Sequence, residues 1–211
     1  MANEHTAPTS GYHGREGRRR ARFFSSWFRA MADRSFGSPM TLALEFLDLQ
    51  RTDKVIDAGS GSGFYTLKLA EKITHGRVLA MDSSPEMLRE LRKRVEKKHL
   101  ARIVEVLQCD ILDVPMADES ADAAVCLFVW HYIENPVESA AELFRLIRPG
   151  GKVFVADFHT NGEVSVKGHH SSRHDRTFTP VEMKEALTAA GFTGVRAETL
   201  KKCVLGYGIR P

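Results

Sequence analysis

A run of β-branched residues leads directly into three glycines spaced two apart, and this segment constrains the fold more than any other part of the chain. Residues 55–64 read VIDAGSGSGF, and a helical pattern begins at Phe64. The pattern predicts a strand, a tight turn and a helix. Glycine lets the backbone take positive φ and approach a ligand closely, and a helix N-terminus offers unpaired N–H groups. We therefore expect a nucleotide-like cofactor at this turn.

The glycine spacing argues against two common nucleotide-binding loops. In the dinucleotide pattern G-x-G-x-x-G, the third glycine would fall on Phe64 when read from Gly59, or on Thr66 when read from Gly61. Neither register fits, which disfavours NAD and FAD. A P-loop is also disfavoured, because no Gly-Lys-Ser/Thr follows the glycines. The remaining pattern is Asp-x-Gly-x-Gly-x-Gly.

Strand-like and helix-like segments alternate along the chain, which predicts an α/β fold with a parallel sheet. Strands are expected at 55–58, 77–81, 103–108, 123–129 and 152–158. Capping residues precede prolines, and so predict helix starts, at Ser84-Pro85, Asn135-Pro136 and Thr179-Pro180. The helix that starts at Pro136 is expected to end at Arg148. Two short strands at 193–200 and 203–209 predict a terminal antiparallel hairpin.

The overall composition fits one globular domain without a metal site. The 211 residues are enough to bury a sizeable core. No apolar run approaches the ~20 residues that span a bilayer, and the first residues lack the apolar region of a signal peptide. The three cysteines, Cys109, Cys126 and Cys203, show neither metal-ligand spacing nor a disulfide framework. We expect a cytoplasmic protein with buried free thiols.

The positive charge of the chain is concentrated at its N-terminus. The first 37 residues contain seven arginines and three acidic residues, while the whole chain has a formal net charge of +3. The remainder is nearly neutral, so no nucleic-acid groove is indicated. We expect residues 1–37 to form an arm with an amphipathic helix, and 38–211 to form the main domain. The arm would act as a lid over the site, contact an anionic membrane surface, or serve as a targeting segment.

Four segments of the chain resemble the class I S-adenosylmethionine (SAM) dependent methyltransferases. They are the glycine loop and residues 77–87, 109–122 and 146–152. The resemblance covers about residues 40–209 and is closest to the type 11 group, related to the ubiquinone/menaquinone C-methyltransferases. It implies a Rossmann-like three-layer sandwich with a seven-stranded, mostly parallel sheet and an antiparallel C-terminal strand. It also implies SAM as cofactor, S-adenosylhomocysteine (SAH) as product and a small-molecule methyl acceptor.

The resemblance further implies that the glycine loop seats the methionine part of SAM. The loop residues concerned are Gly59, Ser60, Gly61 and Gly63. Asp57, at the end of the preceding strand, would balance the ammonium or the sulfonium charge of SAM. The alternative for Asp57 is a structural carboxylate that caps the following helix.

The ribose and adenine contacts implied by the resemblance come from the next strands. Asp82 ends the second strand and would accept both ribose hydroxyls, as acidic residues do in dinucleotide folds. Asp110 ends the third strand and would meet the adenine amine, with capping of a helix as its alternative. The backbone carbonyl of Phe128, at the end of the fourth strand, would meet the methionine ammonium. Ser83, Met87 and Ile111 complete the expected contacts.

Methyl transfer from SAM depends mainly on positioning the donor and the nucleophile, and it needs a general base only if the acceptor must lose a proton. His131, just after the fourth strand, is the candidate base; a packing or hydrogen-bonding role is its alternative. Residues 162–178 contain several histidines, but the stretch is polar and rich in Ser and Gly, so we expect a solvated loop over the acceptor pocket rather than a metal site. A SAM-binding protein without transferase activity is the second interpretation of the whole chain.

Overall fold

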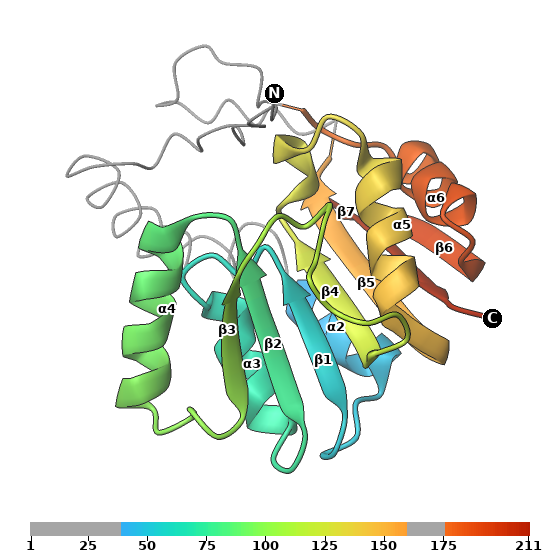
Figure 1. The fold of residues 1–211 in the computed structure, drawn as a ribbon. Coiled ribbons are helices and arrows are strands. Elements are labelled where there is room, and N and C mark those ends of the chain that lie inside the picture. Colours follow the sequence, from blue (N-terminus) through green and yellow to red (C-terminus); the bar gives the residue numbers. More distant parts are fainter. Residues whose placement is uncertain (1–38, 160–175) are drawn as a thin grey trace, which may run out of the picture.

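The computed structural model describes residues 39–159 and 176–211, which build one seven-stranded sheet between helices (Figure 1). The strands are β1 (Lys54–Ala58), β2 (Arg77–Asp82), β3 (Val104–Gln108), β4 (Ala121–Leu127), β5 (Ile147–Phe158), β6 (Thr193–Leu200) and β7 (Cys203–Ile209). The helices are α2 (Pro39–Leu47), α3 (Phe64–Lys72), α4 (Pro85–Lys97), α5 (Pro136–Leu146) and α6 (Pro180–Ala189), with a short 3₁₀ helix η1 (Trp130–Tyr132).

The strand order is β3-β2-β1-β4-β5-β7-β6. The five strands from β3 to β5 pair in parallel. β7 lies between β5 and β6 and is antiparallel to both. The expected seven-stranded sheet with an antiparallel strand inserted near the C-terminus is therefore confirmed, as is the terminal hairpin. The carboxyl ends of the parallel strands, where ligands bind in open α/β sheets, gather at one edge.

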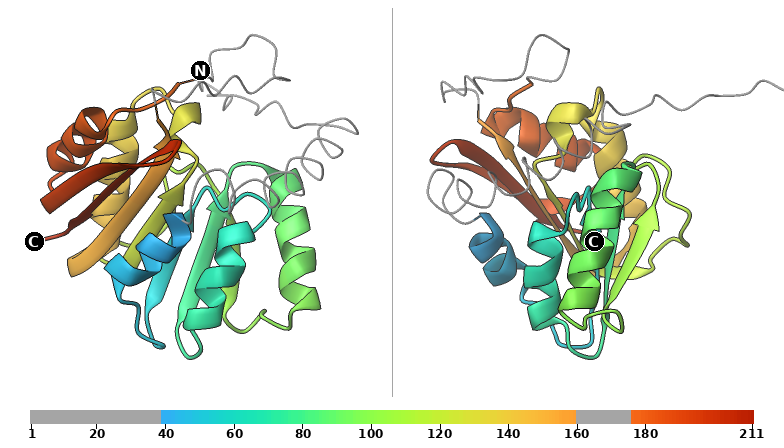
Figure 2. Two further views of the ribbon diagram at one scale, coloured as in Figure 1. Left: turned by 180° about the vertical axis from the view of Figure 1, so that it is seen from behind. Right: turned by 90° about the vertical axis from the view of Figure 1, so that its left-hand side faces the viewer.

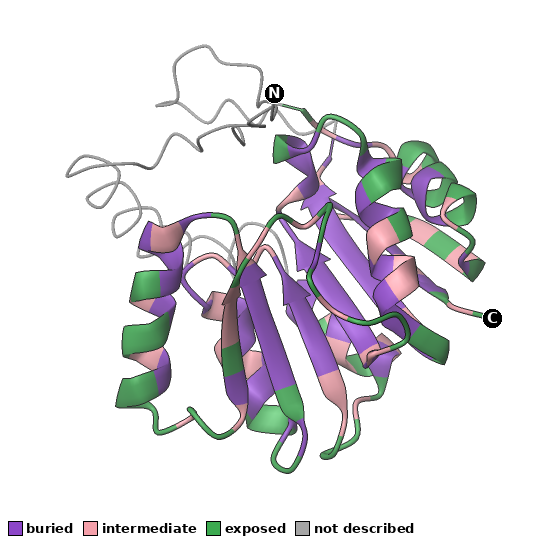
Figure 3. Cartoon of the chain, viewed as in Figure 1, coloured by how far each residue is buried: buried purple, intermediate pink, exposed green. Residues whose placement is uncertain are grey.

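Two helical layers cover the sheet. Helices α2, α3 and α4 pack on one face, and α5 and α6 pack on the other (Figure 2). The central strands are therefore buried on both sides, whereas the outer faces of the helices are exposed (Figure 3). This burial explains why β4 is almost wholly apolar. The predicted three-layer sandwich is confirmed.

All three predicted helix starts are confirmed by their caps. The Ser84 hydroxyl accepts from the backbone N–H of Met87, and the Asn135 side chain accepts from the N–H of Val137. At the start of α6, Thr179 forms a reciprocal capping box with Glu182. The caps fix where each helix begins relative to the strand before it.

The structure differs from the sequence predictions around the turn at Pro149. Helix α5 ends at Leu146 rather than at Arg148, and β5 begins at Ile147 rather than at 152. The reason is a long-range pairing: Gly150 N–H donates to the Arg210 carbonyl, and Arg210 N–H donates to the Gly151 carbonyl. Helix α2 also had no counterpart among the predictions.

The described part of the chain contains no helix long and apolar enough to cross a membrane. The predicted N-terminal arm, 1–37, and most of the predicted loop, 162–178, lie outside the described residues. The proposed lid, membrane and targeting roles of the arm therefore remain predictions.

Candidate functional site

The glycine loop between β1 and α3 is held against the carboxyl end of β2. The backbone N–H groups of Gly59 and Ser60 both donate to the carbonyl of Met81, each at 2.8 Å. The N–H of Gly63 donates to the Ser60 carbonyl at 2.9 Å, which closes the turn. Gly59, Gly61 and Gly63 have φ of 73°, 52° and 86°, a region that glycine adopts without strain.

The three glycines of the loop differ in what lies next to the position of a Cβ atom. A Cβ on Gly59 would collide with the Val129 side chain, and a Cβ on Gly63 would collide with Leu91. A Cβ on Gly61 would meet no described atom within 4 Å. Gly59 and Gly63 therefore allow close packing of the protein on itself, whereas no described residue covers the backbone at Gly61.

A buried polar atom without a protein partner lies in the same loop. The Ser60 hydroxyl is buried and has no hydrogen-bond partner among the described residues. Such atoms normally require an explanation, and a bound ligand is one. Together with the space above Gly61, the Ser60 hydroxyl fits a loop that receives a polar ligand.

Asp82, at the end of β2, contacts this loop directly. Its Oδ2 accepts a hydrogen bond from Gly61 N–H at 2.9 Å, and its Oδ1 accepts from Ser84 N–H at 2.8 Å. Burial raises the pKa of Asp82, and these backbone donors partly offset the rise. Each carboxylate oxygen can accept a second hydrogen bond, so both can still receive a ligand hydroxyl.

Asp57 lies within β1 and is almost completely buried. Its Oδ2 accepts a hydrogen bond from the Thr66 hydroxyl of α3 at 2.5 Å. Helix α3 has Gly63 at its N-cap and no side-chain cap, so Asp57 contacts the first turn of α3 through the Thr66 hydroxyl. Burial raises the pKa of Asp57 to about 7, and the nearby Asp82 charge adds to the rise while the Thr66 hydroxyl opposes it.

The other predicted contact residues occupy the same edge of the sheet in different settings. Asp110 lies two residues beyond the end of β3, so it does not end that strand. It is exposed, and its Oδ1 accepts from Leu112 N–H at 3.0 Å, so it caps a turn rather than a helix, which was the alternative predicted for it. Phe128 follows the end of β4 with φ of 60°. Ser83 is exposed, Met87 is buried in the first turn of α4, and Ile111 is partly buried.

His131 is paired with a carboxylate that sequence reasoning missed. His131 Nδ1 lies 2.8 Å from Oδ1 of Asp157, and both side chains are buried. The short helix η1 that carries His131 is anchored by Trp130, whose indole N–H donates to the Ser139 hydroxyl of α5. Asp157 follows the apolar run VFVA in β5. An acidic residue at the end of a buried strand is the sequence signal that could have identified Asp157.

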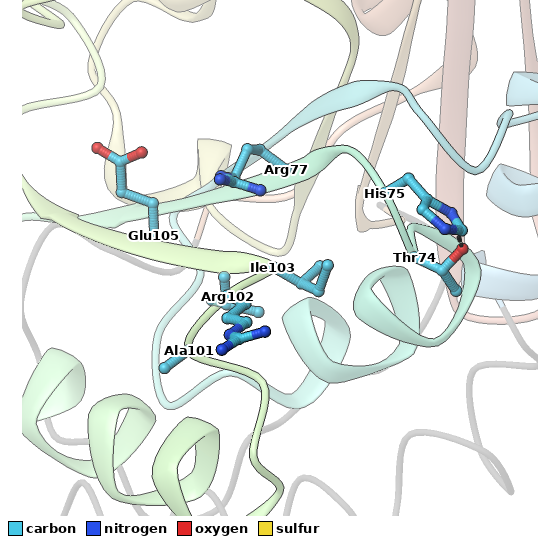
Figure 4. Close-up of a pocket in the computed structure, with 8 residues that line it drawn as sticks. Thr74, His75, Arg77, Ala101, Arg102, Ile103 and Glu105 are labelled. Atoms are coloured by element: carbon cyan, nitrogen blue, oxygen red, sulfur yellow. Dashed lines mark hydrogen bonds between the residues drawn. The ribbon is translucent and has the colours of Figure 1, made fainter.

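A hollow of about 500 Å³ lies at the opposite end of the strands (Figure 4). Its walls include His75, Arg77, Arg102 and Glu105, from the amino ends of β2 and β3. Because the glycine loop and Asp82 lie at the carboxyl ends, this hollow is separate from the candidate cofactor site. Among the described residues, no group of three His, Cys, Asp or Glu side chains could hold a metal ion.

The family of methyltransferase domains matches residues 56–155 of this chain. This stretch of the chain has the sequence of a methyltransferase domain. The match runs from β1 through the glycine loop, Asp82 and η1 to β5, so it includes most of the residues described above. The resemblance inferred from the sequence is confirmed.

Individual proteins similar to this methyltransferase domain support the family and the fold. An uncharacterized 37.1 kDa protein from a Streptomyces fradiae transposon is 35% identical over 127 residues, 60% of this chain and 35% of that protein. A ubiquinone/menaquinone biosynthesis C-methyltransferase from Roseobacter denitrificans is 28% identical over 115 residues, 54% of this chain and 46% of that enzyme. The matches thus span less than half the length of these two relatives.

A crystal structure of a SAM-dependent methyltransferase from Aquifex aeolicus has the same fold as this methyltransferase domain. The TM-score is 0.74 at 23% sequence identity, and the alignment covers 90% of this chain and 98% of that one. At this identity the similarity establishes the fold and leaves the acceptor undefined.

Proposed function

We propose that this chain is a SAM-dependent methyltransferase that acts on a small-molecule acceptor. The observation that carries the proposal is the hydrogen bond between Gly61 and Asp82 beneath open space. It joins a side-chain-free loop to a carboxylate at the carboxyl edge of a parallel sheet, where a nucleoside-like ligand fits.

In the proposed cofactor site, neighbouring elements bind different parts of SAM. The loop from Gly59 to Gly63 would hold the methionine part, with Asp57 beneath it. Asp82 would accept the ribose hydroxyls through the lone pairs that Gly61 and Ser84 leave free. Ser83, Met87, Asp110 and Ile111 would line the adenine, and the carbonyl of Phe128 would meet the ammonium. SAM would supply the methyl group from its sulfonium.

A small-molecule acceptor is supported by the Roseobacter relative, whose name assigns it to ubiquinone and menaquinone biosynthesis. The nearly neutral formal charge of residues 38–211 supports the same acceptor class, because a strongly basic balance is typical of nucleic-acid-binding domains. The competing function is a SAM- or SAH-binding protein without transfer activity. Formation of SAH on addition of an acceptor would distinguish the two.

Calorimetric titration with SAM, SAH, NAD⁺ and NADP⁺ tests the cofactor. We expect SAM and SAH to bind and the nicotinamide nucleotides not to bind. Asp82→Asn removes the charge and keeps one side-chain oxygen, which can still accept from Gly61 although the bond from Ser84 is lost, so we expect SAM affinity to fall about tenfold or more. Glu105→Gln, an exposed carboxylate of β3 (Figure 4), is the matched control. Binding of NAD⁺ without SAM, or full affinity in Asp82→Asn, would contradict the proposal.

A further inference from the structure

His131 presents one ring nitrogen to a buried carboxylate and leaves the other without a described hydrogen-bond partner. We propose that His131 is the general base of the reaction, that Asp157 positions it, and that the acceptor is therefore a small aromatic hydroxyl compound. The inference rests on the proposed function, and it names both a residue role and an acceptor class.

The geometry around Asp157 fixes the tautomer of His131. Oδ2 of Asp157 accepts a hydrogen bond from the backbone N–H of His131 at 3.0 Å, and Oδ1 accepts one from the backbone N–H of Phe158 at 2.8 Å. Oδ1 also lies 2.8 Å from His131 Nδ1. An ionised carboxylate can accept all three hydrogen bonds. Nδ1 therefore carries the proton, and Nε2 keeps the lone pair that a base requires.

His131 lies at the same edge of the sheet as the glycine loop. It follows β4, which pairs with β1 up to Ala58, the residue before the glycine loop. Asp157 lies near the end of β5, on the other side of β4. The two strand ends therefore bring the imidazole to the edge of the sheet that holds the loop and Asp82.

Aromatic rings connect His131 with the helix that follows the glycine loop. The His131 ring lies 3.9 Å from the Tyr132 ring and 4.9 Å from the Phe158 ring, centroid to centroid. Phe158 contacts Phe128 at 5.2 Å, and Phe128 stacks on Tyr65 of α3 at 6.3 Å. Tyr132 is 48% exposed. Tyr65 and Phe128 belong to the core, so the exposed Tyr132 and the partly buried Phe158 are the rings beside His131 that can pack on a flat aromatic ligand, by stacking or edge to face.

The step balances with these groups alone. As the acceptor's hydroxyl oxygen bonds to the methyl carbon of SAM, the carbon–sulfur bond breaks and its electron pair stays on sulfur. The hydroxyl proton passes to Nε2 of His131, and Asp157 stabilises the resulting imidazolium. The products are the methyl ether, SAH and a protonated histidine that returns its proton to water. An uncharged amine needs no base before it attacks, so the dyad favours a hydroxyl acceptor.

A first test needs no acceptor. Nitrogen-15 NMR of the histidine rings in the protein without ligands reports which nitrogen carries the proton. We expect the Nδ1–H tautomer for His131, and we expect Asp157→Asn to shift it toward Nε2–H. His75 is an exposed histidine at the opposite end of the strands (Figure 4). His75→Gln therefore identifies the signals of His75 in the spectrum and should leave those of His131 unchanged. An Nε2–H tautomer in the unmutated protein would overturn the proposal.

A second test measures SAH formation with 2,3-dihydroxynaphthalene and with 2,3-diaminonaphthalene. We expect turnover of the diol, and we expect His131→Gln to lower kcat by about 10²–10⁴-fold with SAM affinity unchanged. Asp157→Asn should lower kcat while KM stays nearly constant, and His75→Gln should match the unmutated enzyme. Turnover of the diamine alone, or full diol activity in His131→Gln, would overturn the inference. Loss of SAM and SAH binding in the unmutated protein would instead refute the proposed function.

Discussion

Asp82 and Gly61 are joined by a 2.9 Å hydrogen bond from the glycine N–H to Oδ2, across 21 residues of sequence. The carboxylate that we propose to receive ribose hydroxyls therefore also orients the loop proposed to hold the methionine part. The two halves of the proposed cofactor seat form one structural unit. A change that removes this carboxylate entirely would disturb the loop as well, which is why the amide variant is the cleaner probe.

Gly61→Ala should weaken SAM binding while costing only about 1 kcal/mol of stability. Alanine at φ of +52° is mildly strained, but its Cβ meets no described atom and would project into the proposed ligand space. We expect a SAM dissociation constant raised about tenfold or more, measured by calorimetry. Unchanged affinity would show that the ligand does not approach Gly61.

Gly63→Ala should act mainly on stability. Its Cβ would collide with the buried Leu91 side chain, and its φ of +86° adds strain. We expect a loss of about 2 kcal/mol or more in urea unfolding. The penalty should shrink in a Leu91→Ala background, since that substitution removes the collision. Equal penalties in both backgrounds would assign the effect to backbone strain alone.

Asp57 should make the stability of the ligand-free protein depend on pH. Its folded-state pKa of about 7 lies above the ordinary 3.8, so between these values the folded state holds a proton that the unfolded state has lost. The contribution of Asp57 is then complete below about pH 3.8, declines as pH rises, and is lost above about pH 7. Each unit of pKa displacement corresponds to about 1.4 kcal/mol.

The variant Asp57→Asn isolates this effect, because its amide does not titrate. We expect its free energy of unfolding, relative to the unmutated protein, to increase from pH 4.5 to pH 7.5, as measured by urea unfolding at several pH values. A constant difference across that range would contradict a raised pKa. If Asp57 faces the cationic part of SAM as proposed, SAM binding at pH 6 should also release protons, and Asp57→Asn should abolish the release.

Arg145 should hold the segment between β3 and β4 against α5. Its guanidinium donates to the carbonyls of Val114 and Met116, and it pairs with Glu142 and Asp118 at 2.6 Å. Arg145 also lowers the pKa of Glu142 through their hydrogen bond. Lysine cannot reproduce this fork of donors, so we expect Arg145→Lys to lose about 1–3 kcal/mol and to speed amide hydrogen exchange at residues 109–120.

Arg148→Lys provides the matched control for Arg145. Arg148 pairs with Asp122 at 2.5 Å, but its side chain is 54% exposed. An exposed pair contributes at most about 1 kcal/mol. Similar losses in the two variants would contradict the clamp assigned to Arg145.

The local features of the fold could be predicted from the sequence, because they depend on short-range chemistry. The cap-proline pairs determined the helix starts, and the spacing of the glycines identified the loop. The start of β5 was missed because Gly150 and Gly151 pair with Arg210, and no local pattern encodes that contact.

In the candidate site, too, local features could be predicted from the sequence and long-range contacts could not. Asp57, Asp82 and His131 were identifiable by position, since each lies at or near the end of an apolar strand. Their partners were not, because they depend on how strands and helices pack. Thr66 reaches Asp57 from α3, and Asp157 reaches His131 from a neighbouring strand.

The position of β7 between β5 and β6 has a consequence for the chain while it is being made on the ribosome. Asp157 pairs with Val204 of β7, so the strand that carries the proposed positioning carboxylate lacks its outer neighbour until residues 203–209 have emerged. Synthesis at roughly 5–20 residues per second leaves that edge open for seconds. A nascent chain thus acquires its reaction edge late, and one interrupted before Cys203 would display β5 as an unpaired edge, able to join a second chain.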